Sequence, residues 1–442
     1  MTKSKISRNP SKPGPLENGK QKHLWEFPRY FRAGAYGWRG TALASKRIAA
    51  AVREIRSVAQ KDSAGAARGI VVFFEKCWRA IEHINSSSGA IGTAVGRAIV
   101  DLTEIFAEAH ISDAERNSLI ERIWDAFQEE DYGYYDELGE LWPKMCGNRE
   151  MASQWADYFL PTVKLVSADT APGAFFKGTI PCLASLITAG RYDEVLDIVR
   201  IEKPGFFHYQ QFGIRALAAK GNLEKALELV ESFADDPSYA GHAAALGEEI
   251  LLSVGREQEA YEKYGLRSAI RSTGLATFSA IVKKYPSLPP ERIVRDLMAF
   301  EPGNEGRYFA AARKAGLIDL AVTIAQTAGV EPKTLTTACK DSLKKNPGLA
   351  LRFGMIALER LAEGFGYDIT SLDVLRAYHA ALDAARASGR EGEILARIAK
   401  IAEHDRSIGR LVSSVIGRRP DFVFGQREGK RLPLEQPDKE HL

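Results

Sequence analysis

The chain has 442 residues, of which 45% are hydrophobic and 26% charged, and its formal net charge is +3. These are ordinary globular proportions, which exclude a wholly disordered, collagen-like or disulfide-rich protein. No uncharged stretch reaches the ~18 residues that a membrane-spanning helix needs, and the N-terminus lacks the apolar core of a secretory signal. We therefore expect a cytoplasmic protein with no membrane partner.

The charge is distributed unevenly along the chain. Residues 1–47 hold eleven Lys or Arg and two Glu, a net charge of +9, and residues 406–431 hold seven basic and two acidic residues, a net +5. Residues 1–22 are rich in Lys, Ser, Pro and Gly and almost lack apolar side chains, which predicts a disordered basic tail. Basic ends on an acidic body can bind a polyanion or fold back onto the body.

The N-terminal third is predicted to be helical. Six aromatic residues between Trp25 and Trp38 predict an extended segment that lies against the first helices. No proline then occurs before residue 143, and an interior proline costs a helix about 3 kcal/mol. Apolar spacing predicts helices over 41–60, 66–84, 89–109, 113–129, 133–145 and 149–167. Ser112 and Glu115 form a capping-box pattern at the fourth of these.

The rest of the chain carries an internal repeat centred on Gly190, Gly221, Gly255, Gly316 and Gly389. Residues four and seven positions before each glycine are mostly apolar, as are those two, five, six and nine positions after it. This pattern predicts a helix, a glycine cap in the left-handed region, and a second helix. The glycines are spaced by 31, 34, 61 and 73 residues, near one or two repeats of a helical-hairpin solenoid.

The predicted fold is therefore all-α, an α-solenoid of helical hairpins. We expect a disordered basic tail over 1–22 and an N-terminal helical domain with its aromatic and basic lead-in segment over 23–170. A hairpin array over 171–405 and a basic C-terminal cap and tail over 406–442 follow.

Parts of the sequence resemble known repeats. Residues 190–233 resemble tetratricopeptide repeats, through the stretches 190–194 and 221–226, because a small apolar residue follows each glycine by five positions. The Trp-Leu-Gly-Tyr signature of the first helix is missing, so these are degenerate repeats. More broadly, residues 24–400 are similar to a group of uncharacterised bacterial helical-repeat proteins, through residues 27–40, 86–92 and 306–312. Some of those relatives are associated with a SWIM-type zinc finger, but the Cys-x-Cys and Cys-x-His pairs are missing here. The resemblance thus implies the fold and no activity.

No catalytic, cofactor or metal motif is visible. The chain has no G-x-S-x-G, G-x-x-x-x-G-K-[ST], G-x-G-x-x-G or H-E-x-x-H pattern. Cys77, Cys146, Cys182 and Cys339 lie 36 to 157 residues apart, so they predict free buried thiols in a reducing cytosol. We expect no enzyme activity, no cofactor and no metal.

Two basic aromatic segments are candidates for nucleic-acid binding, because cations bind phosphates and aromatic rings stack on bases. Their residues are Lys20, Lys22, Arg29, Arg32, Tyr36, Trp38, Arg39, Arg418 and Arg419. The alternative is that the N-terminal aromatics pack on the first helices and the C-terminal segment covers the last hairpin.

A stretch of hydroxyls and glycine is a candidate anion site. Ser86, Ser87, Ser88 and Gly89 open a predicted helix, and Arg97 follows along it. Helix N-termini attract anions through free N–H groups and the helix dipole. The alternative is that the serines only cap the helix.

The main functional hypothesis is a non-enzymatic scaffold or adaptor that holds a partner protein or peptide in the groove of the solenoid. The second hypothesis is a nucleic-acid-associated protein that binds through its basic ends.

Overall fold

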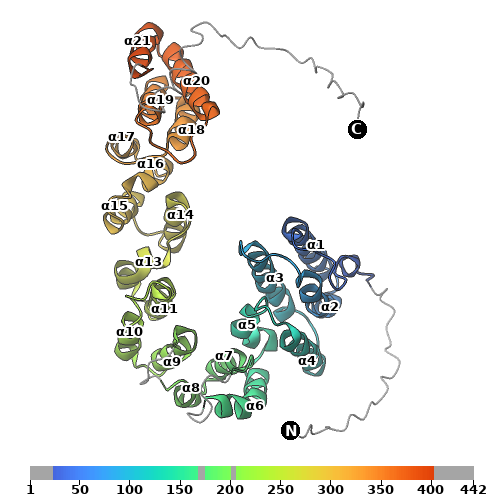
Figure 1. Ribbon diagram of the computed structural model, residues 1–442. Coiled ribbons are helices and arrows are strands. Elements are labelled where there is room, and N and C mark those ends of the chain that lie inside the picture. Colours follow the sequence, from blue (N-terminus) through green and yellow to red (C-terminus); the bar gives the residue numbers. More distant parts are fainter. Residues whose placement is uncertain (1–22, 168–174, 201–205, 403–442) are drawn as a thin grey trace, which may run out of the picture. The chain divides into compact units, whose positions relative to one another are not determined.

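Figure 1 shows the computed structural model of the protein, which describes residues 23–167, 175–200 and 206–402. Over these residues the chain forms helices and turns and no strand, which confirms the predicted all-α class. The predicted tail over 1–22 and cap over 406–442 lie outside the described residues. The chain divides into two compact units, Met1–Asp235 and Asp236–Leu442.

Eleven labelled helical elements belong to the described part of the first unit. They are η1 (Phe27–Tyr30), α1 (Thr41–Ala59), α2 (Ser63–Ile81), α3 (Ala90–Ala107), α4 (Asp113–Glu129), α5 (Glu137–Cys146), α6 (Arg149–Val166), α7 (Thr179–Ala189), α8 (Tyr192–Val199), α9 (Phe207–Ala219) and α10 (Leu223–Glu231). The predicted helices over the first 167 residues are all present, and the ends of α4 agree with the prediction.

Half of the predicted capping box at α4 is formed. The Ser112 hydroxyl accepts the N–H of Glu115 at 3.2 Å. The Glu115 carboxylate does not accept the backbone N–H of Ser112. It accepts a hydrogen bond from Arg68 of α2 at 2.8 Å instead. A contact to a neighbouring helix thus replaces the second, local half of the motif.

The second unit continues with shorter helices. They are α11 (Ala240–Ser253), α12 (Glu257–Ala260), a π-helical turn η2 (Tyr261–Gly265), α13 (Leu266–Ser268), α14 (Gly274–Lys284), α15 (Pro290–Phe300), η3 (Glu305–Tyr308), α16 (Phe309–Lys314), α17 (Ile318–Thr327), α18 (Pro332–Ser342), α19 (Pro347–Ala362), α20 (Ser371–Ala387) and α21 (Glu391–Ala402).

Stacked hairpins build each unit. In the first unit, α3 packs on α2 and also on α1 and α5, and α7 packs on α6, α8, α5 and α9. In the second, α19 packs on α18 and α20 and also on α17 and α21. A helix that contacts both its neighbours and the next helix but one is the arrangement of an α-solenoid. The predicted boundary near residue 170 falls inside the first unit, since α7 packs on α5 and α6.

The five reference glycines end helices as predicted. Their φ angles are +72° (Gly190), +85° (Gly221), +75° (Gly255), +77° (Gly316) and +70° (Gly389), all in the left-handed region. At each one the N–H of the following residue donates to the carbonyl five residues earlier, at 2.9 Å, as Arg191 does to Leu186. This is the hydrogen bond of a Schellman motif, which satisfies a carbonyl that the helix end leaves free. One local device therefore ends the first helix of all five hairpins.

The aromatic lead-in segment packs on the first helices, as predicted. Phe27 and Phe31 are each 2% exposed, and their rings lie 6.2 and 5.6 Å from the Phe73 ring of α2. The segment is not wholly extended, because Phe27–Tyr30 forms a 3-10 turn with Pro28 near its start. These aromatic residues belong to the hydrophobic core of the first unit, whose buried residues run from Phe27 to Ala216 in sequence. The second unit has its own hydrophobic core, from Tyr261 to Ile398.

Candidate functional site

The structure changes the set of residues proposed for nucleic-acid binding. Lys20, Lys22, Arg418 and Arg419 lie outside the described residues. Tyr36 was predicted as a stacking residue, but it is 5% exposed and its ring lies 6.4 Å from that of Phe31. A ring enclosed in the core has no face for a base, so Tyr36 leaves the candidate set.

Four candidate residues of the lead-in segment are exposed. Arg32 and Arg39 are exposed, and the Trp38 side chain is 68% exposed. Arg29 is also exposed but engaged, because its Nη2 donates to Glu26 at 3.1 Å and to the Tyr30 hydroxyl at 2.6 Å. The name lead-in surface is used below for Arg32, Trp38 and Arg39.

The predicted anion-binding loop lies beside the lead-in surface. The backbone N–H of Asn85 donates to the Trp38 carbonyl at 3.1 Å, which joins the start of this loop to the lead-in segment. Ser86, Ser87 and Ser88 are exposed, and the Ser88 hydroxyl accepts the N–H of Ala90 at 3.4 Å. The N-cap of α3 is Gly89, which makes no side-chain cap hydrogen bond.

Glycine at position 89 fits that loop because its φ is +67° at the N-cap of α3. Arg97 is exposed, seven residues into α3. No contact places its guanidinium at the loop among the described residues.

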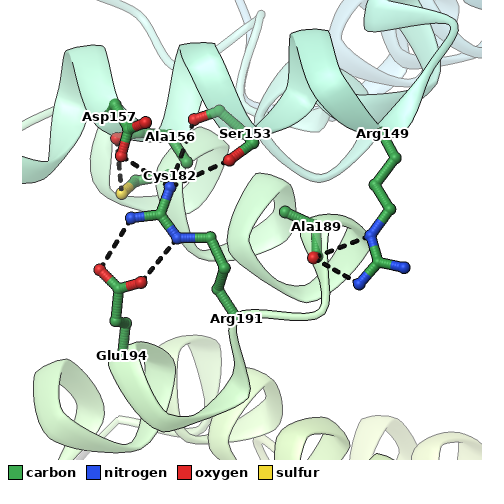
Figure 2. A network of polar contacts seen from close by, with 8 residues as sticks. All are labelled: Arg149, Ser153, Ala156, Asp157, Cys182, Ala189, Arg191 and Glu194. Carbon is green, nitrogen blue, oxygen red and sulfur yellow. Dashed lines mark hydrogen bonds and ion pairs between the residues drawn. The ribbon is translucent and has the colours of Figure 1, made fainter.

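A polar network joins α6, α7 and α8 in the first unit (Figure 2). The Arg191 guanidinium donates through Nε and Nη2 to both Glu194 oxygens, at 2.6 and 2.8 Å. Its Nη1 reaches Asp157 at 2.6 Å and the Ser153 hydroxyl at 3.1 Å on α6. These hydrogen bonds from Arg191 lower the pKa of the Glu194 carboxyl. One guanidinium thus binds two carboxylates, and through Asp157 it links the start of α8 to α6.

A second arginine caps the neighbouring helix end. The Arg149 guanidinium donates to the Ala189 carbonyl at the C-terminus of α7, at 2.9 and 2.6 Å. A cation is favourable at this negative end of the helix dipole.

All four cysteines are free and buried, as predicted. Burial raises the pKa of Cys146 and Cys182 to about 12 and that of Cys339 to about 11, and it raises the pKa of Cys77 further. No three His, Cys, Asp or Glu side chains gather as metal ligands within the described ranges. None of the helices in those ranges has both the length and the apolar surface that a membrane span requires.

The second unit carries an open groove between α18 and α20, of about 360 Å³. We call it the α18–α20 groove. Its apolar floor comes from Pro332, Leu361 and Ile369, and its rim carries three cations and two carboxylates. Pro332 occupies the first turn of α18, where a proline costs no hydrogen bond and fixes the start of the helix.

The charges on the rim are only partly paired. Lys333 lies 3.4 Å from Asp373, and this carboxylate also accepts the backbone N–H of Thr370 in the capping box of α20. The Thr370 hydroxyl and N–H, with Lys333, hold the pKa of the Asp373 carboxyl below its ordinary value. Lys340 and Arg376 have no ion-pair partner within the described ranges. The groove therefore presents two cations without an ion-pair partner, one from each helix, and its rim carries a net charge of +1 because Glu331 is the second carboxylate.

A glycine-rich turn borders the groove. Gly366 has a φ of +126°, and a Cβ there would lie 3.3 Å from Pro332 and 3.2 Å from Ile369. Only glycine fits both the dihedral angle and the space. This turn leaves the Tyr367 side chain 85% exposed at the groove.

None of the residues predicted to form a binding site lines this groove. Its local signals were present, namely the aromatic Gly-Phe-Gly-Tyr stretch over 364–367 and the prolines that begin α18 and α19. What was missing was the packing of α18 against α20, which brings Lys340 and Arg376 to one groove.

Comparison with known proteins adds no assignment. No protein-family model, curated protein or solved structure matches this chain.

Proposed function

We propose that the protein is a non-enzymatic interaction scaffold that holds an acidic, extended segment of a partner protein in the α18–α20 groove. The observation that carries the proposal is that Lys340 and Arg376, on the two helices that border a partly apolar groove of net positive charge, have no ion-pair partner among the described residues. Carboxylates of a partner would pair with these cations, and its apolar side chains would occupy the floor.

The size and shape of the groove support a peptide. About 360 Å³ accommodates a few side chains, and its open form suits a continuous chain better than an enclosed small molecule. Tyr367 is exposed beside it and supplies a rigid aromatic contact, the type of residue that dominates many protein interfaces. Helical-hairpin arrays commonly bind extended segments along such surfaces.

We also propose that the hairpins are degenerate tetratricopeptide-like units, related to the uncharacterised bacterial helical-repeat proteins that the sequence resembles. The five glycine-capped hairpins support this relation. Four buried free cysteines support a reducing compartment, the cytoplasm.

A charge-reversal experiment tests the scaffold function. The wild-type chain, Lys340→Glu/Arg376→Glu, and Lys344→Glu/Lys345→Glu are purified from cells, and the copurified proteins are quantified by mass spectrometry. Lys344 and Lys345 are exposed just beyond α18 and do not line the groove, so the control makes the same change in charge.

The proposal predicts that a partner retained by the wild type and the control is lost from the groove variant. An acidic synthetic segment of that partner should then bind the purified wild type at least tenfold more tightly than the groove variant. Equal binding of the segment to all three proteins would refute the assignment to this groove.

Nucleic-acid binding is the second candidate, favoured by the adjacency of the lead-in surface and the Ser86–Ser88 loop. The backbone hydrogen bond from Asn85 to Trp38 joins the segment that carries the exposed Trp38 to the loop that carries the exposed serines, and Arg32 and Arg39 flank Trp38 in sequence. Phosphates would contact the arginines and a base would stack on Trp38.

This second candidate is tested with a labelled single strand of ~20 nucleotides, by fluorescence anisotropy over a salt series. Arg32→Ala/Arg39→Ala should weaken binding about tenfold and flatten the dependence of log K on log salt, whereas Arg53→Ala/Lys76→Ala should have little effect. Deleting residues 1–47 is unsuitable, because it removes the buried Phe27 and Phe31. Salt-insensitive binding would exclude this function.

A further inference from the structure

The first unit carries a second groove, between α4 and α6, of about 450 Å³. We call it the α4–α6 groove. Its lining includes two carboxylates, Glu121 and Asp125, and three aromatic residues, Trp124, Trp155 and Tyr158. No Lys or Arg lines it. Its composition is thus opposite in charge to that of the α18–α20 groove.

The two carboxylates lie one helical turn apart on α4, and both are exposed. Glu121 accepts a hydrogen bond from the neutral Asn117 amide at 2.8 Å, and no cation pairs with Asp125 within the described ranges. The charges of the groove therefore remain uncompensated.

The arginines of α4 are engaged elsewhere. Arg122 lies 2.7 Å from Glu75 on α2. Arg116 is buried, and its guanidinium donates to the carbonyls of Phe106, Ala109 and Met145. Neither arginine can neutralise the groove without breaking these contacts.

One exposed aromatic residue supplies a face for a cation. Tyr158 is 63% exposed, and its ring lies 5.4 Å from that of Trp155 on the same helix. Trp155 and Trp124 are only 5% and 3% exposed, so the Tyr158 ring is the aromatic face of this groove that a ligand can reach. Cations are attracted to the faces of Trp and Tyr, and nearby carboxylates reinforce that attraction.

We propose that the α4–α6 groove binds an arginine or lysine side chain presented by a basic segment of a partner protein. The charge complementarity selects a cation, and the exposed Tyr158 ring favours one on a long apolar stem over a hydrated metal ion. This site is in a different unit from the α18–α20 groove and takes a ligand of opposite charge. An experiment that refutes one of the two proposals therefore leaves the other unaffected.

The test uses a fluorescein-labelled peptide of alternating Arg and Gly, and the same peptide with citrulline in place of arginine. Citrulline keeps the shape of the side chain and removes its charge. Fluorescence anisotropy measures the binding of both peptides to the full-length protein. The variants are Glu121→Gln/Asp125→Asn and Tyr158→Ala, and the matched control is Glu108→Gln/Glu150→Gln, which removes two exposed carboxylates of the same unit outside the groove.

We expect the arginine peptide to bind at least tenfold more tightly than the citrulline peptide. Both groove variants should lose at least fivefold in affinity, and the control should match the wild type. Equal binding of the two peptides, or an equal loss in the control, would overturn the proposal. All the changed side chains are exposed, and circular dichroism verifies that each variant is folded.

The basic N-terminus of the same chain is the competing occupant. If it filled the groove, deletion of residues 1–22 would raise the affinity for the arginine peptide about tenfold, and that result would also overturn the proposal. An unchanged affinity after the deletion supports a partner segment as the ligand.

Discussion

Glu248 places a carboxylate at a position of α11 where the repeat calls for an apolar residue. It is 1% exposed, and three donors hold it: the Tyr285 hydroxyl at 2.6 Å, the Lys284 ammonium at 2.7 Å and the Ser268 hydroxyl at 2.5 Å. A buried charge is tolerated only when such partners replace water. The glutamate therefore ties α11 to residues near the ends of α13 and α14.

Tyr285→Phe removes one of these donors and keeps the ring. Since a hydrogen bond to a buried carboxylate is lost, we expect a decrease of about 1–3 kcal/mol in the free energy of unfolding, measured by urea denaturation. Tyr367→Phe makes the same change at an exposed position and should cost less than ~0.5 kcal/mol. Equal effects of the two substitutions would mean that the Glu248 cluster contributes nothing to stability.

The buried cysteines give a prediction about reactivity. With a pKa of about 12 for Cys146 and Cys182 and about 11 for Cys339, almost no thiolate exists at pH 8. Because the thiolate is the nucleophile, native protein should react with a disulfide reagent at least ~100-fold more slowly than protein unfolded in guanidinium. A native thiol that reacts at the unfolded rate would contradict the burial of that residue.

At the scale of elements, Arg191 links the start of α8 to Asp157 of α6, and its pair with Glu194 in the first turn of α8 should stabilise that helix start in a pH-dependent way. Arg191 lowers the pKa of the Glu194 carboxyl below its ordinary 4.5, so its contribution to stability is present above that pH. The contribution is lost as pH falls through the folded-state pKa. Glu194→Gln should destabilise by about 0.5–1 kcal/mol at pH 7, with the difference shrinking toward pH 3 in urea titrations. A difference that grows on acidification would contradict the assigned direction.

The glycine caps allow a graded test of the hairpin ends. Gly221→Ala adds a Cβ into open space at a φ of +85°, so only the left-handed conformation is penalised, by about 1–2 kcal/mol. Gly190→Ala should cost about 1–3 kcal/mol more, because its Cβ would overlap the Arg149 guanidinium and displace it from the Ala189 carbonyl.

Gly92→Ala is the control for this series. Gly92 lies within α3 with no atom near its ideal Cβ, and alanine favours a helix, so the variant should be as stable as the wild type or more stable. Thermal unfolding ranks the three variants. If Gly190→Ala were no worse than Gly221→Ala, the link between Arg149 and α7 would contribute nothing.

Over the whole molecule, features set by local chemistry could be predicted from the sequence. The caps at Gly190 and Gly389 follow from a glycine between two apolar stripes, and the start of α4 follows from Ser112. Such signals act within a few residues and need no knowledge of distant contacts. The all-α fold and its hairpins follow from their repetition.

Features that depend on packing could not be predicted. Tyr36 and Trp38 are two residues apart in one aromatic segment, yet the first is buried and the second exposed. Neither amino-acid composition nor the spacing of apolar residues distinguishes Tyr36 from Trp38. The path of the backbone decides which of the two side chains is buried. The two grooves could not be predicted for the same reason, because the residues that line each one lie on helices that come together only in the folded protein.

Site-specific crosslinking at the α18–α20 groove tests the scaffold function most directly. Tyr367 is replaced by p-benzoylphenylalanine in cells, with Val254, 52% exposed and outside the groove, as the control position. We predict a discrete protein adduct at position 367 that disappears with Lys340→Glu/Arg376→Glu and persists with Lys344→Glu/Lys345→Glu. The same adducts at both positions, or an adduct at 367 that survives charge reversal in the groove, would contradict the account.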